Sequence, residues 1–255
     1  MKGCLLLARK DLTVLFRSPL AWILLTCFLV ICGYFFVSAV RYFELVSMQL
    51  MRNSQAMDIT AMELVVGPFL QNSGVILLFF LPLLTMRGFS EEKKMGTFEV
   101  LMSYPLREAH LVGGKLLALA GFLFVALAFN ALSPALLFLF TTPELPAVLV
   151  GYLGLYLMAV GFAALGLFLS TLTENQIVSA SLTFAALLLL WLLSWLKSMV
   201  PPSVEPVVLG VSLLSHFESF TKGVFDVADA IYYLTFTAGF FWLSVLSLEN
   251  QRWRG

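Results

Sequence analysis

Charged residues are scarce in this chain. Only 12% of its 255 residues are Asp, Glu, Lys or Arg, whereas 60% are hydrophobic; a soluble domain carries roughly 25% charged residues. Acidic and basic residues are equal in number, with 15 of each, so the overall charge gives no reason to expect nucleic acid as a partner. A chain with so few polar groups is unsuited to a water-facing surface, and we expect it to reside in a membrane.

Cysteine and histidine are also rare, with three and two residues. Cys27 and Cys32 lie inside the first apolar run, Cys4 precedes it, and none has metal-ligand spacing with a histidine. We therefore expect three free thiols, with neither a disulfide framework nor a metal site.

No catalytic motif is recognisable in the sequence. The stretch HLVGGKLL at 110–117 superficially resembles a phosphate-binding loop, but Ala109 and Leu116 stand where that loop needs glycine and Ser or Thr. We predict that the chain is not an enzyme, that it has no catalytic residues, and that it binds neither ATP nor another cofactor by itself.

Six apolar runs are long enough to cross a membrane as helices, which takes about 20 residues each. They are predicted at Leu20–Val40, Phe69–Met86, Leu116–Phe140, Ala147–Leu169, Ile177–Leu196 and Ala230–Leu248. None contains Asp, Glu, Lys, Arg or His, the residues that ion-coupled transporters place at membrane depth. The sequence predicts an all-α polytopic membrane protein with six transmembrane helices, in which any transport is driven by another polypeptide.

Lysine and arginine are distributed unevenly between the predicted connections. With the N-terminus inside, segments 1–19, 87–115, 170–176 and 249–255 hold eleven of them and the outer segments hold four. The positive-inside rule then favours cytoplasmic N- and C-termini. In segment 1–19 the basic residues follow one side of a helix, so we expect an interfacial helix against anionic lipid headgroups.

Two outer connections are predicted to contain helix. The first span is expected to extend as a helix to about Asn53, and Gly67-Pro68 is expected to mark the end of the following loop. The connection 203–229 is too apolar for a free loop and too short for a span and its return. We expect external re-entrant helices there, partly inserted in the outer leaflet.

The start of the last span carries two aspartates. Asp226 and Asp229 have the spacing of N-cap and third helical position, where carboxylates are favoured by exposed amide groups. We predict a structural role for both. His216 and Glu218 are expected either to pair or to face solvent, and we assign them no chemistry.

The stretch FSEEKKMGTFEVLMSYP at 89–105 gathers charge between the second and third spans. Gly96 is expected to break the chain, Thr97 to cap a new short helix, and Pro105 to end that helix. Phe98 and Leu101 would give the helix an apolar side, which a solvated loop does not need. We predict a short helix nearly parallel to the membrane that fits a groove on a cytoplasmic partner.

The run from Phe89 to Leu101, followed by Pro105 and by Gly114-Lys115, resembles the motif of type-2 ABC transporter permeases. In that family, an E-K-x-x-G-T-h-E-x-L run forms the coupling helix that contacts the ATP-binding subunit. The resemblance covers nearly the whole chain. The stretch HFESFTKGVFDVADAIYY at 216–233 is most similar to the permease of the gliding-motility ABC transporter (GldF-like).

This resemblance implies a single transmembrane permease domain over 1–255, with a coupling-helix loop at 87–110. It implies coupling roles for Glu91, Glu92, Gly96, Thr97, Phe98, Glu99, Leu101 and Pro105. The implied partners are a cytoplasmic ATP-binding ABC subunit, a second permease that is identical or related, and membrane lipid. The implied location is the bacterial cytoplasmic (inner) membrane, and the implied function is ATP-driven export or envelope-associated transport.

Alternatives to this interpretation stay open at the level of sequence. The chain could instead be a non-transporting anchor that passes ATPase motion to an envelope partner. A membrane enzyme acting on lipid would need a cluster of polar residues near an interface, which the sequence does not show. The small residues of the fourth span, among them Gly151, Gly154, Gly161 and Gly166, fit either internal packing or a subunit interface.

Overall fold

The computed structural model describes residues 2–52, 60–98, 107–139, 144–198, 201 and 205–252. Every regular element in these ranges is a helix, which confirms the predicted all-α fold. In chain order they are α1 (Lys2–Arg17), α2 (Pro19–Arg52), the π-helical turn η1 (Met62–Val66), α3 (Gly67–Thr85), α4 (Ser90–Lys94), α6 (Glu108–Asn130), α7 (Leu132–Ala135), the 3-10 turn η2 (Leu136–Leu139), α8 (Leu145–Leu172), α9 (Gln176–Leu192), the 3-10 turn η3 (Leu193–Ser198), α10 (Glu205–Val211), α11 (Leu213–Thr221) and α12 (Val227–Arg252).

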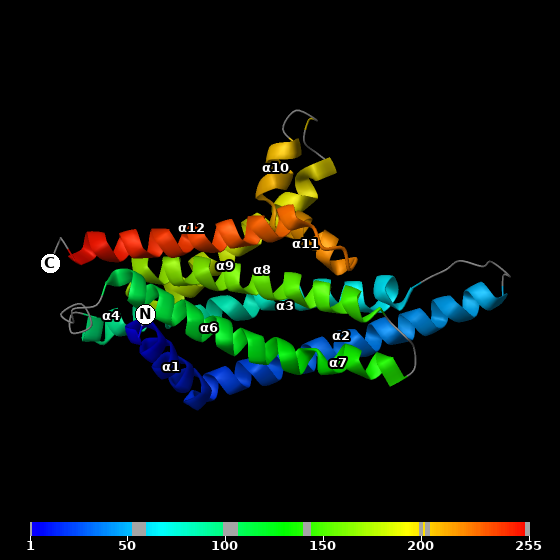
Figure 1. Cartoon of the computed structure of the whole chain (residues 1–255), viewed down its shortest axis with the longest axis horizontal. Helices are drawn as coiled ribbons and strands as arrows, with labels where there is room; N and C mark the ends of the chain where they lie inside the picture. Colours follow the sequence, from blue (N-terminus) through cyan, green and yellow to red (C-terminus); the bar gives the residue numbers. More distant parts are fainter. Residues whose placement is uncertain are drawn as a thin grey trace.

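Six of the described helical stretches are long and apolar enough to span a membrane, as predicted. They begin at Pro19, Met62, Glu108, Leu145, Gln176 and Val227. Figure 1 shows them as an elongated bundle, with α4 and the two chain ends toward one end and α10 projecting sideways. The chain is therefore a multi-pass membrane protein.

Gly67-Pro68 does not mark the end of the loop after the first span, as was predicted, because the helix already begins at Met62 and runs on to Thr85. The Gly67 N–H donates to the Met62 carbonyl five residues back, which makes the preceding turn a π-helix. A proline has no N–H and disrupts an ordinary helix interior. The wider turn just before Pro68 changes the hydrogen-bond register where the proline stands, as single π-helical turns do within α-helices.

The third span begins earlier than hydropathy predicts, at Glu108 instead of Leu116. Two charged residues in its first two turns are buried, and each has a partner of opposite charge. The Glu108 carboxylate pairs with Arg252 at 2.7 Å, and the Lys115 ammonium pairs with Glu92 at 2.7 Å. A buried charge without a partner would be costly, and pairing lets the helix contain both residues. The predicted loop 87–110 therefore overlaps the start of α6.

Helix α8 lies at the centre of the bundle and contacts α3, α6, α9, α11 and α12. In the most apolar window of both α3 and α8, 61% of the residues are buried, against 22% in α2, α9 and α12. The helices with mostly exposed apolar side chains surround the two that are mostly buried. This arrangement fits a bundle whose outer face meets lipid.

Close approach to α8 depends on its glycines. A Cβ atom at Gly154 would lie 2.3 Å from Phe220 Cγ, and one at Gly166 would lie 2.2 Å from Thr85 Oγ1. At Gly151 it would lie 2.4 Å from Leu70 Cδ1. Of the two open explanations for these small residues, the structure therefore uses them for packing within the chain.

We predict that Gly166→Ala destabilises the bundle by about 1–3 kcal/mol, the usual effect of adding a methyl group to a packed core. Thermal unfolding of the purified chain in detergent measures this. The matched control is Gly239→Ala in α12, where no atom lies within 4 Å of the added methyl group and helix propensity favours alanine. Equal melting temperatures for the two variants would contradict the close α3–α8 contact.

Candidate functional site

The charged segment after α3 packs against the last turn of α8. Gly88 makes this possible, because a Cβ atom there would lie 2.6 Å from Leu167 Cδ2 and 3.1 Å from Ser170 Oγ. The next two residues, Phe89 and Ser90, have no exposed surface. The start of the segment therefore forms part of the packed bundle, whereas Lys94 to Thr97 are exposed.

Helix α4 donates hydrogen bonds to the last turn of α8. The Ser90 hydroxyl donates to the Ser170 carbonyl at 3.1 Å, and the Lys93 ammonium donates to the Thr171 carbonyl. The Phe89 N–H also donates to Ser170 Oγ at 3.3 Å. The last carbonyls of a helix have no partner within the helix, and a lysine there also complements the negative end of the helix dipole.

Helix α12 contributes to the same helix end. Gln251 Nε2 donates to the Thr171 carbonyl at 2.8 Å, and Thr171 Oγ1 donates to Ser247 Oγ at 2.8 Å. The carbonyl of Thr171 thus accepts from two elements, α4 and α12. The end of α8 is the point at which the charged segment and the last span are joined.

The opposite side of α4 is tied to α6 and α1 by charge. Lys115 Nζ lies 2.7 Å from Glu92 Oε1 and 3.9 Å from Asp11 Oδ2, and its side chain is only 10% exposed. The same ammonium lies 5.0 Å from the centre of the Phe89 ring, a distance at which a cation is attracted to an aromatic face. Lys115 therefore links three helices, α1, α4 and α6.

The structure describes five of the eight predicted coupling residues. Glu91 and Glu92 lie on α4, half-buried, and Gly96 has a φ of 68°, so the chain does break there. Thr97 and Phe98 start a further helical turn. Thr97 Oγ1 donates to the Glu92 carbonyl at 3.2 Å. Phe98 packs against the core, and Lys93 Nζ lies 5.2 Å from the centre of its ring. Glu99, Leu101 and Pro105 lie outside the described residues, as do the amides that Thr97 was predicted to cap.

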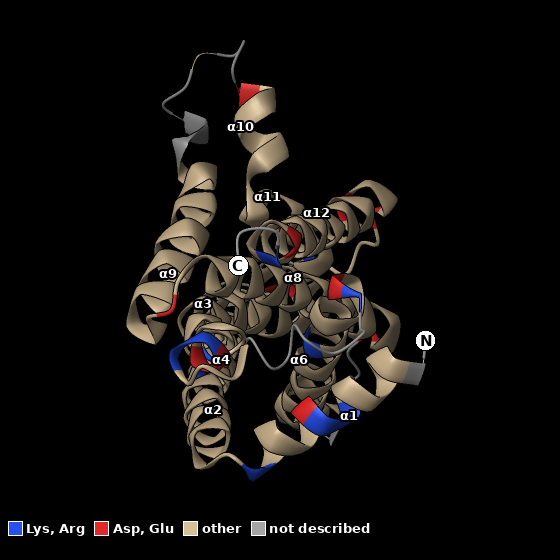
Figure 2. Cartoon of the chain, turned by 90° about the vertical axis from the view of Figure 1, so that its left-hand side faces the viewer, with Lys and Arg blue, Asp and Glu red and all other residues tan. Residues whose placement is uncertain are grey.

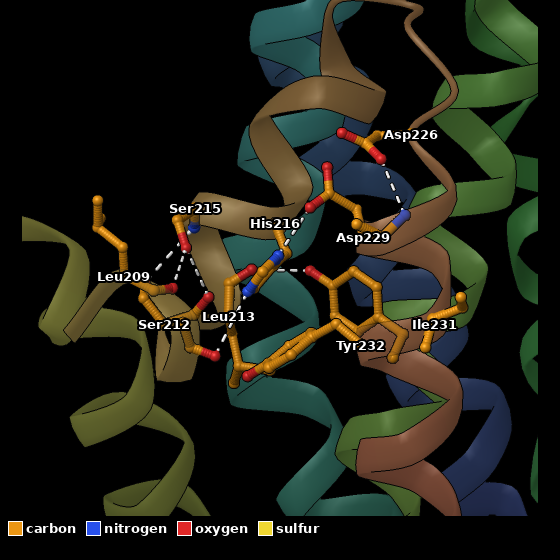
Figure 3. Close-up of polar contacts among 12 residues, drawn as sticks. Leu209, Ser212, Leu213, Ser215, His216, Asp226, Asp229, Ile231 and Tyr232 are labelled. Atoms are coloured by element: carbon orange, nitrogen blue, oxygen red, sulfur yellow. Dashed lines mark hydrogen bonds and ion pairs between the residues drawn. The ribbon is translucent and has the colours of Figure 1, made fainter. Parts of the chain in front are cut away.

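A second polar cluster joins the helices α10, α11 and α12 (Figure 3). His216 Nδ1 lies 2.7 Å from Asp229 Oδ1, and the His216 ring stacks on Tyr232 with 3.9 Å between ring centres. The Tyr232 hydroxyl donates to the Val211 carbonyl, and that of Tyr233 donates to the Leu213 carbonyl, at 2.8 and 2.7 Å. These contacts fasten both short helices to the start of the last span.

This cluster corrects part of the prediction for the two aspartates. Asp226 Oδ1 accepts from the Ala228 N–H at 2.8 Å and caps α12 as expected. Asp229 instead points toward His216, to which no chemistry was assigned, whereas Glu218 is exposed. The pair was missed because His216 and Asp229 belong to different helices, and only the reversal at Gly223, with a φ of 76°, brings them together.

We predict that Asp229→Ala loosens α10 and α11, since it removes the hydrogen bond between His216 and Asp229, whose side chains are 21% and 11% exposed. Losing one partner of such a bond costs about 1–3 kcal/mol, so amide hydrogen exchange over 205–221 should become about tenfold faster or more. Asp226→Ala is the matched control, and it should speed exchange only in the first turn of α12. Unchanged exchange over 205–221 in Asp229→Ala would contradict the fastening role.

Comparison with protein-family models places most of the chain in one family. The model described as ABC-2 family transporter protein matches residues 5–246. No curated protein sequence matches the chain. The match begins within α1 and ends six residues before the end of α12, so it includes all or most of each of the six membrane-length helices. The chain therefore belongs to the ABC-2 family of transporter proteins.

Proposed function

We propose that this chain is the permease subunit of an ATP-driven transporter, and that segment 87–105 receives motion from a separate ATP-binding subunit. Membership of the ABC-2 family implies such a partner. The finer assignment rests on the hydrogen bonds from α4 to the last carbonyls of α8. A segment held in this way cannot shift without acting on the central helix of the bundle.

The contacts of α8 define a route for that motion. This helix has 28 residues, so it is about 42 Å long at 1.5 Å per residue. Near its other end, Gly154 packs against Phe220 of α11, and Gly151 packs against Leu70 of α3. Displacement of α4 is thereby passed along one continuous helix to α11 and, through the His216–Asp229 pair, to α12.

We place the α4 end of the bundle in the cytoplasm. Figure 2 views the molecule from that end and shows that α1 and α4 carry both acidic and basic residues. The excess of Lys and Arg in segments 1–19 and 87–115 supports this orientation. In α1, Leu5, Leu6 and Val14 are 66%, 68% and 57% exposed, which suits an interfacial helix whose apolar side meets lipid.

The remaining parts of the proposal rest on the sequence. They are a bacterial inner membrane location, a second permease of identical or related sequence, and export or envelope-associated transport of the gliding-motility type. The stretch 216–233 carries the resemblance to that type. Coupling roles for Glu99, Leu101 and Pro105 likewise rest on the sequence motif.

The α4–α8 contacts are tested by Ser90→Ala combined with Lys93→Met. Together these changes remove one neutral and one charge-assisted hydrogen bond, worth about 2–4 kcal/mol. The complex with a candidate ABC ATPase subunit is reconstituted in vesicles, with a spin label on each permease chain at Val224, which is 58% exposed. We expect ATP to change the label distances in the wild-type complex and not in the double variant, while the ATPase stays bound.

Lys94→Met is the matched control, because Lys94 neighbours Lys93 on α4 but is exposed. It should leave the ATP-dependent distance change intact. A double variant that responds to ATP like the wild type would refute transmission through α8. Failure of the wild-type chain to assemble with the ATPase would refute the proposed partner itself.

The partner-facing residues are tested by Glu99→Ala combined with Leu101→Ala. We expect normal membrane insertion, because neither residue lies in one of the six apolar runs of the sequence, together with ATP hydrolysis that no longer drives activity. The measurements are the amount of chain in the membrane fraction, the ATPase rate and the ATP-dependent label distance at Val224. Glu144→Ala, at the start of α8 on the opposite side, should preserve coupling; normal coupling in the double variant would exclude the role of Glu99 and Leu101.

A further inference from the structure

The ring of His216 faces a hydrogen-bond acceptor at each of its two nitrogens. Nδ1 lies 2.7 Å from Asp229 Oδ1 (Figure 3), and Nε2 lies 3.4 Å from the Gly210 carbonyl oxygen. A neutral imidazole has a single N–H, so it can donate to only one of these acceptors. The protonated ring has two N–H groups and can donate to both. The hydrogen-bond geometry therefore fits the imidazolium form.

Tyr232 favours the same charged form. Its ring stacks on that of His216, with 3.9 Å between ring centres and 19° between the ring planes. A cation is attracted to the face of an aromatic ring. The Tyr232 hydroxyl donates to the Val211 carbonyl at 2.8 Å, which holds this ring beside the end of α10. His216 thus meets a carboxylate, a carbonyl and an aromatic face, and each of them favours a positive charge on the imidazole.

The end of α10 depends on side-chain donors of this kind. None of the seven residues of α10 is buried, so packing contributes little to its position. The last carbonyls of a helix have no partner within the helix. Here they accept from side chains of α11 and α12: Leu209 from Ser215, Gly210 from His216 and Val211 from Tyr232. Among these donor types, only histidine ordinarily changes its charge between pH 5 and 8.

Other charged groups around the ring are few. Helices α3, α8 and α9, which contact α11, contain no charged residue. The charged residues on α10, η3, α11 and the connection to α12 are Glu205, Lys197, Glu218, Lys222 and Asp226. Of these, Glu218 and Lys222 are exposed, and Asp226 caps α12. Among the ion pairs of the described side chains, Asp229 is the partner of the ring.

We propose that His216 and Asp229 form a proton-binding site that fastens α10 and α11 to α12 and releases them as the pH rises. Deprotonation removes one N–H group and the positive charge, so the ring can no longer donate to both Asp229 and Gly210. The fastened arrangement holds the protonated ring better than the released one does. It therefore binds the proton more tightly, and by linkage a lower pH favours it.

The site gives the outer helices a response to the medium around them. With the orientation given under the proposed function, His216 lies near the outer end of the bundle, so the proton comes from the external side. Phe220 of α11 packs against Gly154 of the central helix α8. The proton thus governs how firmly α12 follows a movement of α8 and α11. The side from which the proton comes rests on the proposed function, whereas the pH dependence itself does not.

Amide hydrogen exchange of the full chain in detergent tests this proposal. The exchange rate over 205–221 is compared at each pH with that of His216→Gln, so that the intrinsic effect of pH on exchange cancels. Glutamine keeps a donor for Asp229 but does not titrate. We expect the wild type to exchange about tenfold more slowly than His216→Gln at about pH 6 and equally fast at about pH 8.5, as for one charge-assisted hydrogen bond from a group that titrates between pH 5 and 8.

His110→Gln is the matched control, because His110 is the other histidine of the chain and lies on α6. It should keep the pH dependence of the wild type. Nitrogen-15 spectra of this variant then read the His216 ring directly, and we expect two protonated ring nitrogens at about pH 6 and one at about pH 8.5.

Three results would overturn the proposal. They are the same ratio of exchange rates between wild type and His216→Gln at both pH values, loss of the pH dependence in His110→Gln, and an unchanged number of protons on the His216 ring. Because the chain is measured alone, a failure here is distinct from a failure to assemble with an ATPase.

Discussion

The last carbonyls of α8 set the main constraint on this structure. A helix that ends near a membrane boundary must find donors for its final carbonyl groups, because neither the helix nor the hydrocarbon supplies them. Ser90 and Lys93 of α4 and Gln251 of α12 supply these donors. The requirement for hydrogen-bonded carbonyls thus joins the charged segment, the central helix and the last span at one point.

Glycine makes α8 suitable as the element that connects the two ends of the bundle. Thr85, Leu70 and Phe220 each occupy space that a side chain on α8 would otherwise fill. Close packing resists small independent movements, so neighbouring helices follow α8 when it moves. On the other side of α4, Lys115 and the carboxylates of Asp11 and Glu92 connect α4 to α1.

The sequence predicts the membrane helices well, because each is a long apolar run and hydropathy is a local property. It predicts the ends of these helices less well, since whether a charged residue can belong to a span depends on a partner that is distant in the sequence. Glu108 and Lys115 extend the third span through pairing with Arg252 and Glu92. The π-turn at Met62–Val66 lets the helix begin before Gly67-Pro68, where the loop was expected to end. In the candidate site, the charged stretch and its glycine break are visible in the sequence. The acceptors Ser170 and Thr171 are not, because they lie about 80 residues away along the chain.

The central claim is that α4 moves together with the end of α8. Structures of the assembled complex with and without bound ATP test this most directly, with α4 and the last turn of α8 compared after superposition on α2. We predict that both shift as one unit, with the Ser90–Ser170 and Lys93–Thr171 hydrogen bonds present in both states. A shift of α4 that breaks these bonds while α8 stays in place would contradict the account.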